Sequence, residues 1–174
     1  MAAKRARREA PACFHPGDRH VLPYPWAVAR TFAPLIALSD GERAATNIQT
    51  VVAEEPHSAP CRVSLKDAEP GERLILLSYQ HQPADSPFRS SGPIFVREAA
   101  HEAAAMIDEI PDAIARRTIS VRAYDAEAMM VEGELSEGAE LAPLLDRLME
   151  RPDVDVIHLH YARRGCFAAL VERV

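Results

Sequence analysis

The sequence predicts a single α+β domain in which two or three helices pack on a mainly antiparallel β-sheet. Three observations predict this class. Most apolar segments are short and follow one another in pairs joined by turn residues, a pattern typical of hairpins. Few helical segments separate them, so the crossover connections of a parallel sheet are scarce. The 174 residues are enough for one domain with a core of its own.

The N-terminal segment differs from the rest of the chain. It is basic and then punctuated by prolines, and it shows no sustained hydrophobic period. Such a composition is typical of a segment that cannot bury enough apolar surface to fold. We therefore expect a disordered arm at residues 1–26 and the folded domain at residues 27–174.

The first half of the domain contains one predicted helix and a series of strands. Pro34 is expected to limit the first apolar segment to an amphipathic turn. Ser39 and Glu42 have the spacing of a capping box, which predicts a helix over residues 40–46. Residues 73–81 are apolar on both faces, which predicts a strand in the middle of a sheet. Further strands are expected at residues 48–54, 61–65 and 93–98.

The second half combines helical and strand patterns. Apolar residues within residues 98–110 recur at i, i+3, i+4 and i+7, which predicts a helix that Pro111 stops. The remaining elements are expected to be a hairpin, a helix with a leucine face, and a terminal hairpin, at residues 117–135, 140–150 and 154–173.

Charge and cysteine content exclude several classes of protein. The net charge of −6, from 20 basic and 26 acidic residues, argues against a nucleic-acid-binding protein. No apolar run approaches the roughly 18 residues that a membrane helix requires, and no signal peptide is evident. Cys13, Cys61 and Cys166 have no disulfide-framework spacing, which favours reduced thiols. We expect a cytoplasmic protein without membrane or nucleic-acid partners.

The terminal hairpin carries the most suggestive polar residues. His158 and His160 are two positions apart in a predicted strand, so both imidazoles point to the same side of the sheet. Cys166 opens the following strand. Two imidazoles and a thiol in this arrangement are compatible with a metal site, a nucleophile with its base, or a hydrogen-bonded core.

The turn of this hairpin decides where Cys166 lies. A three-residue turn, Arg163–Gly165, places the glycine at the left-handed position of a type I turn with a bulge. His160 then faces Ala168, and Cys166 shares the face of the histidines. A four-residue turn shifts the pairing by one residue and puts Cys166 on the opposite face. We favour the three-residue turn because Gly165 stands where the bulge requires it.

A metal site needs a third protein ligand. His81 ends the predicted central strand and is the best candidate to join His158 and His160 around a divalent metal such as zinc. Cys166 or Cys61 would complete the set. Two alternatives stay open. In the first, the site is catalytic and uses a thiol–imidazole pair; its catalytic residues are unknown, with Cys166, His160 and His158 as candidates. In the second, the cluster is structural.

The segment of residues 81–93 is a second candidate region. Arg89, Ser90 and Ser91 are suited to hold a carboxylate or phosphate, and Arg62 is a further candidate ligand-binding residue. A surface turn explains the same residues. Around Tyr124, the simplest explanation of Arg122 and Asp125 is a structural ion pair.

Several of these segments together resemble the bacterial domain-of-unknown-function family 1203. They are CRVSLKDAEPGERLILLSYQHQPADSPFRSSGPIFVRE, SVRAYDAEAMM and IHLHYARRGCFAALVER, and the resemblance runs from about Phe32 to the C-terminus. Tyr161 stands where family members often have asparagine. The positions that match the family pattern are Cys61, Arg62, Tyr79, His81, His158, His160, Gly165 and Cys166.

The resemblance implies a single bacterial domain and no established activity. Together with the histidines, it leads us to expect an uncharacterised protein with a small-ligand or metal-binding site at the HxH hairpin. The alternatives are a non-catalytic binding protein with a structural His/Cys cluster, or a Cys–His thiol enzyme. The sequence does not indicate which reaction, if any, the protein catalyses.

Overall fold

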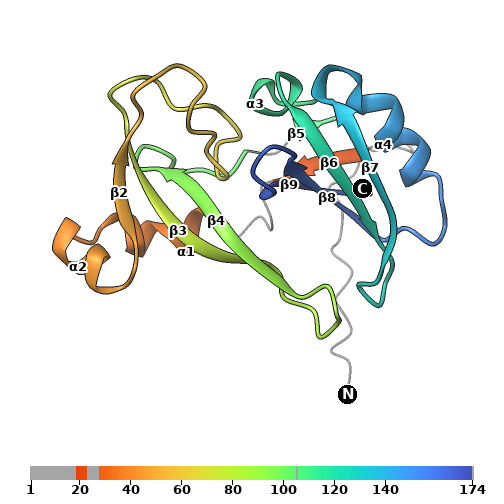
Figure 1. Cartoon of the computed structure of the whole chain (residues 1–174), viewed down its shortest axis with the longest axis horizontal. Coiled ribbons are helices and arrows are strands. Elements are labelled where there is room, and N and C mark those ends of the chain that lie inside the picture. Colours follow the sequence, from red (N-terminus) through yellow and green to blue (C-terminus); the bar gives the residue numbers. More distant parts are fainter. Residues whose placement is uncertain (1–18, 23–27, 105, 174) are drawn as a thin grey trace.

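The computed structural model describes residues 19–22, 28–104 and 106–173, whose strands form two antiparallel sheets lying side by side (Figure 1). In the larger sheet the strand order is β5-β1-β9-β8-β6-β7, with bounds Met106–Ile107, Arg19–Leu22, Cys166–Arg173, Val156–Tyr161, Thr118–Tyr124 and Met130–Glu137. In the smaller sheet the order is β2-β3-β4, with bounds Gln49–Val52, Arg73–Gln82 and Ser90–Arg97. The expected α+β class with antiparallel pairing is therefore confirmed.

Helices cover one face of each sheet. The helices of the described residues are α1 (Val28–Ile36), α2 (Asp40–Ala45), α3 (Asp112–Ala115) and α4 (Leu141–Met149), and a 3-10 turn, η1 (Gly138–Glu140), precedes α4. The buried leucines of α4 pack with apolar residues of β6, β8 and β9 into one core. Phe32 of α1 packs against the smaller sheet in a second core. The opposite face of the larger sheet contacts the smaller sheet, where His81 of β3 meets His160 of β8 and Phe167 of β9.

Several elements match their sequence patterns. Ser39 caps α2, and its hydroxyl and the Glu42 carboxylate form the reciprocal bonds of a capping box. β3 is the central strand of its sheet, as its two apolar faces indicate. β6 and β7 form the expected hairpin. The leucine face of α4 is buried, and Pro143 lies in the first turn, where its missing N–H costs no hydrogen bond.

The helix expected at residues 98–110 is wrong. Within that range β5 pairs with β1, Ala104 N–H donates to the Val63 carbonyl at 2.9 Å, and Asp108 has a φ of 53°. A residue in the left-handed conformation interrupts an α-helix. The segment therefore does not form a helix, although its apolar residues have helical spacing. The helix begins instead after Pro111, as α3.

Two smaller predictions are also wrong. The segment expected as a strand at residues 61–65 forms isolated bridges and a turn, in which the Cys61 sulfur accepts main-chain N–H groups and Leu65 has a φ of 52°. Pro34 does not restrict this segment to a single turn: it lies inside the nine-residue helix α1, which ends two residues later at Ile36.

The predicted arm at residues 1–26 is described only in part. Residues 19–22 form β1, which pairs with β9 on one side and β5 on the other. The rest of the predicted arm, residues 1–18 and 23–26, lies outside the described residues, as does Cys13. None of the helices described here is both long and apolar enough to cross a membrane.

Candidate metal centre

His158 and His160 lie on β8, in the middle of the larger sheet. Both side chains are only 1% exposed, and their alternation along the strand directs them to the face turned away from α4. On the neighbouring strand β6, Ser120 pairs with His160 and Arg122 with His158. Those two side chains therefore stand beside the imidazoles on the same face.

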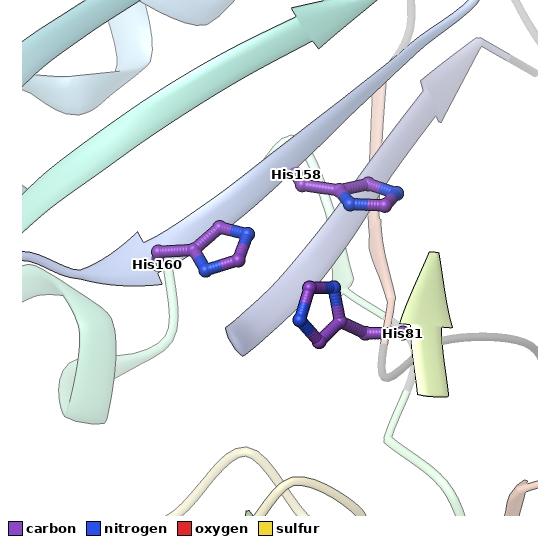
Figure 2. A group of neighbouring side chains, drawn as sticks. All are labelled: His81, His158 and His160. Carbon is purple, nitrogen blue, oxygen red and sulfur yellow. The ribbon is translucent and has the colours of Figure 1, made fainter. Parts of the chain in front are cut away.

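The third histidine comes from the other sheet. Tyr79 of β3 pairs with Gly92 and Gln82 with Ser90, so Gln80 and His81 share a bulge at this point. A bulge bends the strand and re-aims its side chains. His81, which is 5% exposed, meets the histidines of β8, and Figure 2 shows the three rings converging from two strands.

The three imidazoles are close enough to share one ion. One nitrogen from each ring can be chosen so that all lie within 4.8 Å of one another, and the ring centroids of His81 and His160 are 5.0 Å apart. Two nitrogens bound to tetrahedral zinc at about 2.0–2.1 Å lie roughly 3.3 Å apart. The nitrogens therefore have to approach one another by up to about 1.5 Å to reach zinc geometry.

The hydrogen bond of His160 assigns a role to each of its nitrogens. Nδ1 lies 2.9 Å from the Gly165 carbonyl oxygen, which can only accept a hydrogen bond, so Nδ1 is the protonated nitrogen that donates it. Nε2 then carries the lone pair, and it is buried without a hydrogen-bond partner among the described residues. This is the arrangement found around metal-ligating histidines, in which one nitrogen is oriented by a carbonyl and the other binds the ion.

His81 has a similar free position. Its Nε2 lies 3.5 Å from the Ser90 hydroxyl, a long contact, while Nδ1 is buried and has no partner within the part of the chain that the structure describes. A buried polar atom without a partner is costly, and a bound ion removes that cost.

The imidazoles of His81 and His160 are in the neutral form that binds a metal ion. Burial lowers the pKa of His81 from 6.5 to about 4, with the positive charge of Arg122 adding to the effect. Burial likewise lowers the pKa of His160 to about 3, although the bond to Gly165 opposes the shift. Both rings are neutral at pH 7, so a metal ion does not have to displace a proton from either.

Aromatic rings enclose the cluster. The Phe167 ring of β9 stacks on His81 at a centroid distance of 5.2 Å and meets His158 and His160 edge-on. Tyr124 of β6 lies 4.8 Å from the His158 ring, and Phe88 contacts Tyr124 in turn. The apolar rings keep water from the imidazoles and so strengthen any electrostatic interaction among them.

Cys166 is not part of this cluster, and the predicted register is wrong. Cys166 pairs with Tyr161 and Phe167 with His160, so the turn has four residues and Cys166 lies on the opposite face. Gly165 does adopt the expected left-handed conformation, with a φ of 71°. The bulge falls at Ala168 instead of in the turn. Beyond this bulge, from the pairing of Leu159 with Ala169 onward, the strands are in the register that the three-residue turn predicts.

The remaining candidate residues lie away from the three histidines, apart from Ser90. Arg62 is buried, donates from Nε to the Phe167 carbonyl at 2.8 Å and stacks on Tyr161. Arg89 and Ser91 are exposed. The Cys61 thiol is buried and accepts hydrogen bonds from main-chain N–H groups.

Sequence reasoning missed the neighbours of the histidines. The ion pair expected between Arg122 and Asp125 does not form, because Asp125 instead accepts the N–H groups of Glu127 and Met129. Arg122 and Tyr124 alternate along β6 just as the two histidines do along β8. That alternation was visible in the sequence, but only the pairing of β6 with β8 shows that the two sets share a face.

Comparison with known proteins gives a match to a protein family. The family model described as "Protein of unknown function (DUF1203)" matches residues 58–173, which include all three histidines and the terminal hairpin. No curated protein and no solved structure matches the chain.

Proposed function

The chain belongs to this family of proteins of unknown function, and we propose that it binds a divalent transition-metal ion, such as zinc, through His81, His158 and His160. The single observation that carries the proposal is the convergence of three buried imidazoles from two sheets. Three histidines leave one position of a tetrahedral zinc ion for water or another ligand, as in catalytic zinc sites. A cytoplasmic location, in which Cys61 and Cys166 stay reduced, is part of the proposal.

The electrostatics of the cluster support a metal over a hydrogen-bonded core. A structural cluster satisfies its ring nitrogens with carbonyls, carboxylates or hydroxyls. Here Nε2 of His160 and Nδ1 of His81 have no such partner among the described residues, and both lie in the cluster that would hold the ion. Imidazole nitrogen is also a ligand that zinc, copper, iron and nickel prefer.

A thiol–imidazole enzyme is less well supported. Cys166 lies on the face opposite the histidines, so neither imidazole of β8 is placed to act as its base. Cys61 is buried beneath the turn that its sulfur organises.

The test is metal analysis of the full chain purified without a histidine tag. We expect about one zinc or other transition-metal ion per chain after loading and dialysis. The variants His81→Gln, His158→Gln and His160→Gln should each lower the affinity for the ion at least tenfold. His101→Gln is the matched control, because His101 is exposed and outside the cluster, and it should bind as the wild type does.

A thermal melt supplies an independent readout. A ligand present at 100 times its Kd stabilises the folded state by about 2.7 kcal/mol. For a chain of this size that raises Tm by roughly 5–10 °C. A wild type that neither retains metal nor shows a higher Tm when zinc is added would establish the cluster as structural.

A further inference from the structure

Arg122 is a cation that no carboxylate of the described residues neutralises. It pairs across the sheet with His158, and its Nε lies 3.4 Å from the Ser120 hydroxyl on the same strand. Its side chain is partly exposed, whereas the three imidazoles are buried. Arg122 therefore lies beside the buried rings that Figure 2 shows converging and is itself accessible to solvent.

Two of the three acidic residues of the neighbouring strand β7 face the other way. Glu132 pairs with Ala123 and Glu134 with Val121, so both carboxylates lie on the face that α4 covers. There they form ion pairs with Arg151 and Arg147 respectively. Opposite Arg122 on this strand is Gly133, which has no side chain to offer.

The third acidic residue of β7, Glu137, is on the face of Arg122 but pairs with Thr118 at the other end of β6, and it accepts a hydrogen bond from the Thr118 hydroxyl. Glu172 also lies on this face, on β9, two strands away from Arg122. None of these four carboxylates forms an ion pair with Arg122.

Among the described residues, the charges that act on His81 and His160 are positive. Arg122 acts on His81, His160 and Tyr124 through its positive charge, and Arg62 acts on His160 in the same sense. Three neutral imidazoles leave a bound divalent ion with its full charge of +2, and Arg122 adds one more. Like charges at this separation repel strongly where water is excluded, unless an anion lies between them.

We propose that the ligand completing the metal site is a small carboxylate, held between the ion and the Arg122 guanidinium. The inference rests on the proposed function, since it assigns the substrate class of that same site. One planar guanidinium fork matches the two oxygens of a carboxylate. Ser120 and Tyr124, the other polar side chains on this part of β6, are uncharged. Arg62, the other nearby cation, donates to the carbonyls of Phe167 and Pro60, so we assign the anion to Arg122 and favour a carboxylate over a phosphate.

Cobalt-loaded protein tests the proposal, because the visible spectrum of Co²⁺ changes when an anion binds to it. We would titrate acetate and, separately, inorganic phosphate into wild type, Arg122→Gln and Arg122→Lys. Cobalt affinity is measured in parallel by competition with a chromophoric chelator. Arg147→Gln is the matched control, since Arg147 is an exposed arginine whose partner Glu134 lies on the opposite face.

The two measurements should move in opposite directions. Arg122→Gln should weaken acetate binding about ten- to a hundredfold, the effect of losing one charge-assisted bond, while cobalt binds as tightly as before or more tightly, because a repelling charge is gone. Arg122→Lys, which keeps the charge and loses the fork, should weaken acetate less. Arg147→Gln should change neither.

The outcomes separate the two proposals. A wild type that takes up no cobalt overturns the metal site and this inference with it. Cobalt uptake with equal acetate affinity in wild type and Arg122→Gln overturns the inference alone. Loss of both cobalt and acetate binding in Arg122→Gln would show that Arg122 has a structural role and overturn the inference. Tighter binding of phosphate than of acetate by the wild type would also overturn it, because phosphate would then replace carboxylate as the ligand class.

Discussion

His160 shows how one residue joins the hairpin turn to the candidate site. Its Nδ1 donates to the carbonyl of Gly165, the left-handed residue of the turn, and its Nε2 is directed into the cluster. The turn bond therefore orients the ring that we propose binds the ion. Losing the ring affects the turn and the site together, but the two roles belong to different atoms.

The two roles of His160 can be separated by substitution. In His160→Asn the amide nitrogen takes the position of Nδ1, so the bond to Gly165 is kept while the Nε2 ligand is lost. We expect metal affinity to fall at least tenfold and the free energy of unfolding to change by less than about 1 kcal/mol. His160→Ala, which loses both the bond and the ring, should cost about 2–4 kcal/mol in urea unfolding. Equal costs for the two variants would contradict this assignment.

The buried imidazoles make the metal-free protein sensitive to acid. The unfolded chain has histidine pKa values near 6.5, whereas the folded pKa values are about 4 for His81 and about 3 for His160. The unfolded state therefore binds more protons as pH falls below 6.5, and stability is lost on the acid side. Between pH 6.5 and 4.5 each ring should remove about 2 kcal/mol.

The measurement is the free energy of unfolding in urea at several pH values, with a chelator present to keep the protein free of metal. The double variant His81→Gln/His160→Asn should show a much shallower decline over the same range. His101→Gln, with its exposed ring, serves as the control and should follow the wild type. A wild-type curve that is flat from pH 6.5 to 4.5 would contradict the lowered pKa values.

At the scale of elements, Gly138 fixes the approach of η1 to the helix α3 and the start of β6. A Cβ at this position would lie 2.1 Å from the Ile114 carbonyl oxygen and 2.7 Å from that of Arg117. Its own N–H donates to the Arg117 carbonyl at 2.9 Å. Both obstacles are main-chain atoms, which cannot rotate away as a flexible side chain can.

Gly138→Ala should therefore destabilise the protein by about 2–4 kcal/mol, because α3 and η1 must move apart. Gly41→Ala is the control. Gly41 lies in α2 with no atom within 4 Å of the added methyl group, so the change should be neutral or stabilise by up to about 1 kcal/mol. Equal Tm values for Gly138→Ala and the wild type would show that the backbone yields here at little cost.

Elements with a complete local signal were predictable, and those that depend on distant partners were not. Helix α2 has its own capping box, and α4 has a leucine face bounded by prolines. The apolar spacing within residues 98–110 was equally helical, but it includes β5, whose partner β1 is more than 80 residues earlier in the chain. Local periodicity cannot report a competing strand at that distance.

At the scale of the whole molecule, Arg62 connects the two sheets. It is buried in the turn before β3, yet it donates to the carbonyls of Phe167 on β9 and Pro60. Its guanidinium also lies over the rings of Phe95 on β4 and Tyr161 on β8. Phe167, whose carbonyl accepts the bond from Arg62, also stacks its ring on His81, so this bond is made at the residue that contacts the histidine of β3.

Replacing Arg62 should loosen the contact between the sheets. Arg62→Met keeps much of the apolar stem and leaves the Phe167 carbonyl without its donor, so we expect a loss of about 2–4 kcal/mol. Metal affinity should fall as well, since His81 is no longer held against β8. Arg89→Met, at an exposed arginine, is the control. Unchanged zinc affinity in a destabilised Arg62→Met would limit Arg62 to a role in stability.

The sequence by itself determined the α+β class, the family, the capped and amphipathic helices, and the common face of His158 and His160. All of these depend on the period of side chains along one element or on a contiguous motif. His81 was also a correct choice for the cluster, because it ends the central strand.

Only the tertiary structure decided which residues surround the histidines. The four-residue turn placed Cys166 on the far face, and the pairing of β6 with β8 brought Arg122 beside His158. The bulge in β3 turned His81 toward the other sheet. The physical reason is the same in each case: a one-residue change in register exchanges the two faces of a strand, and register is set by pairing between distant segments.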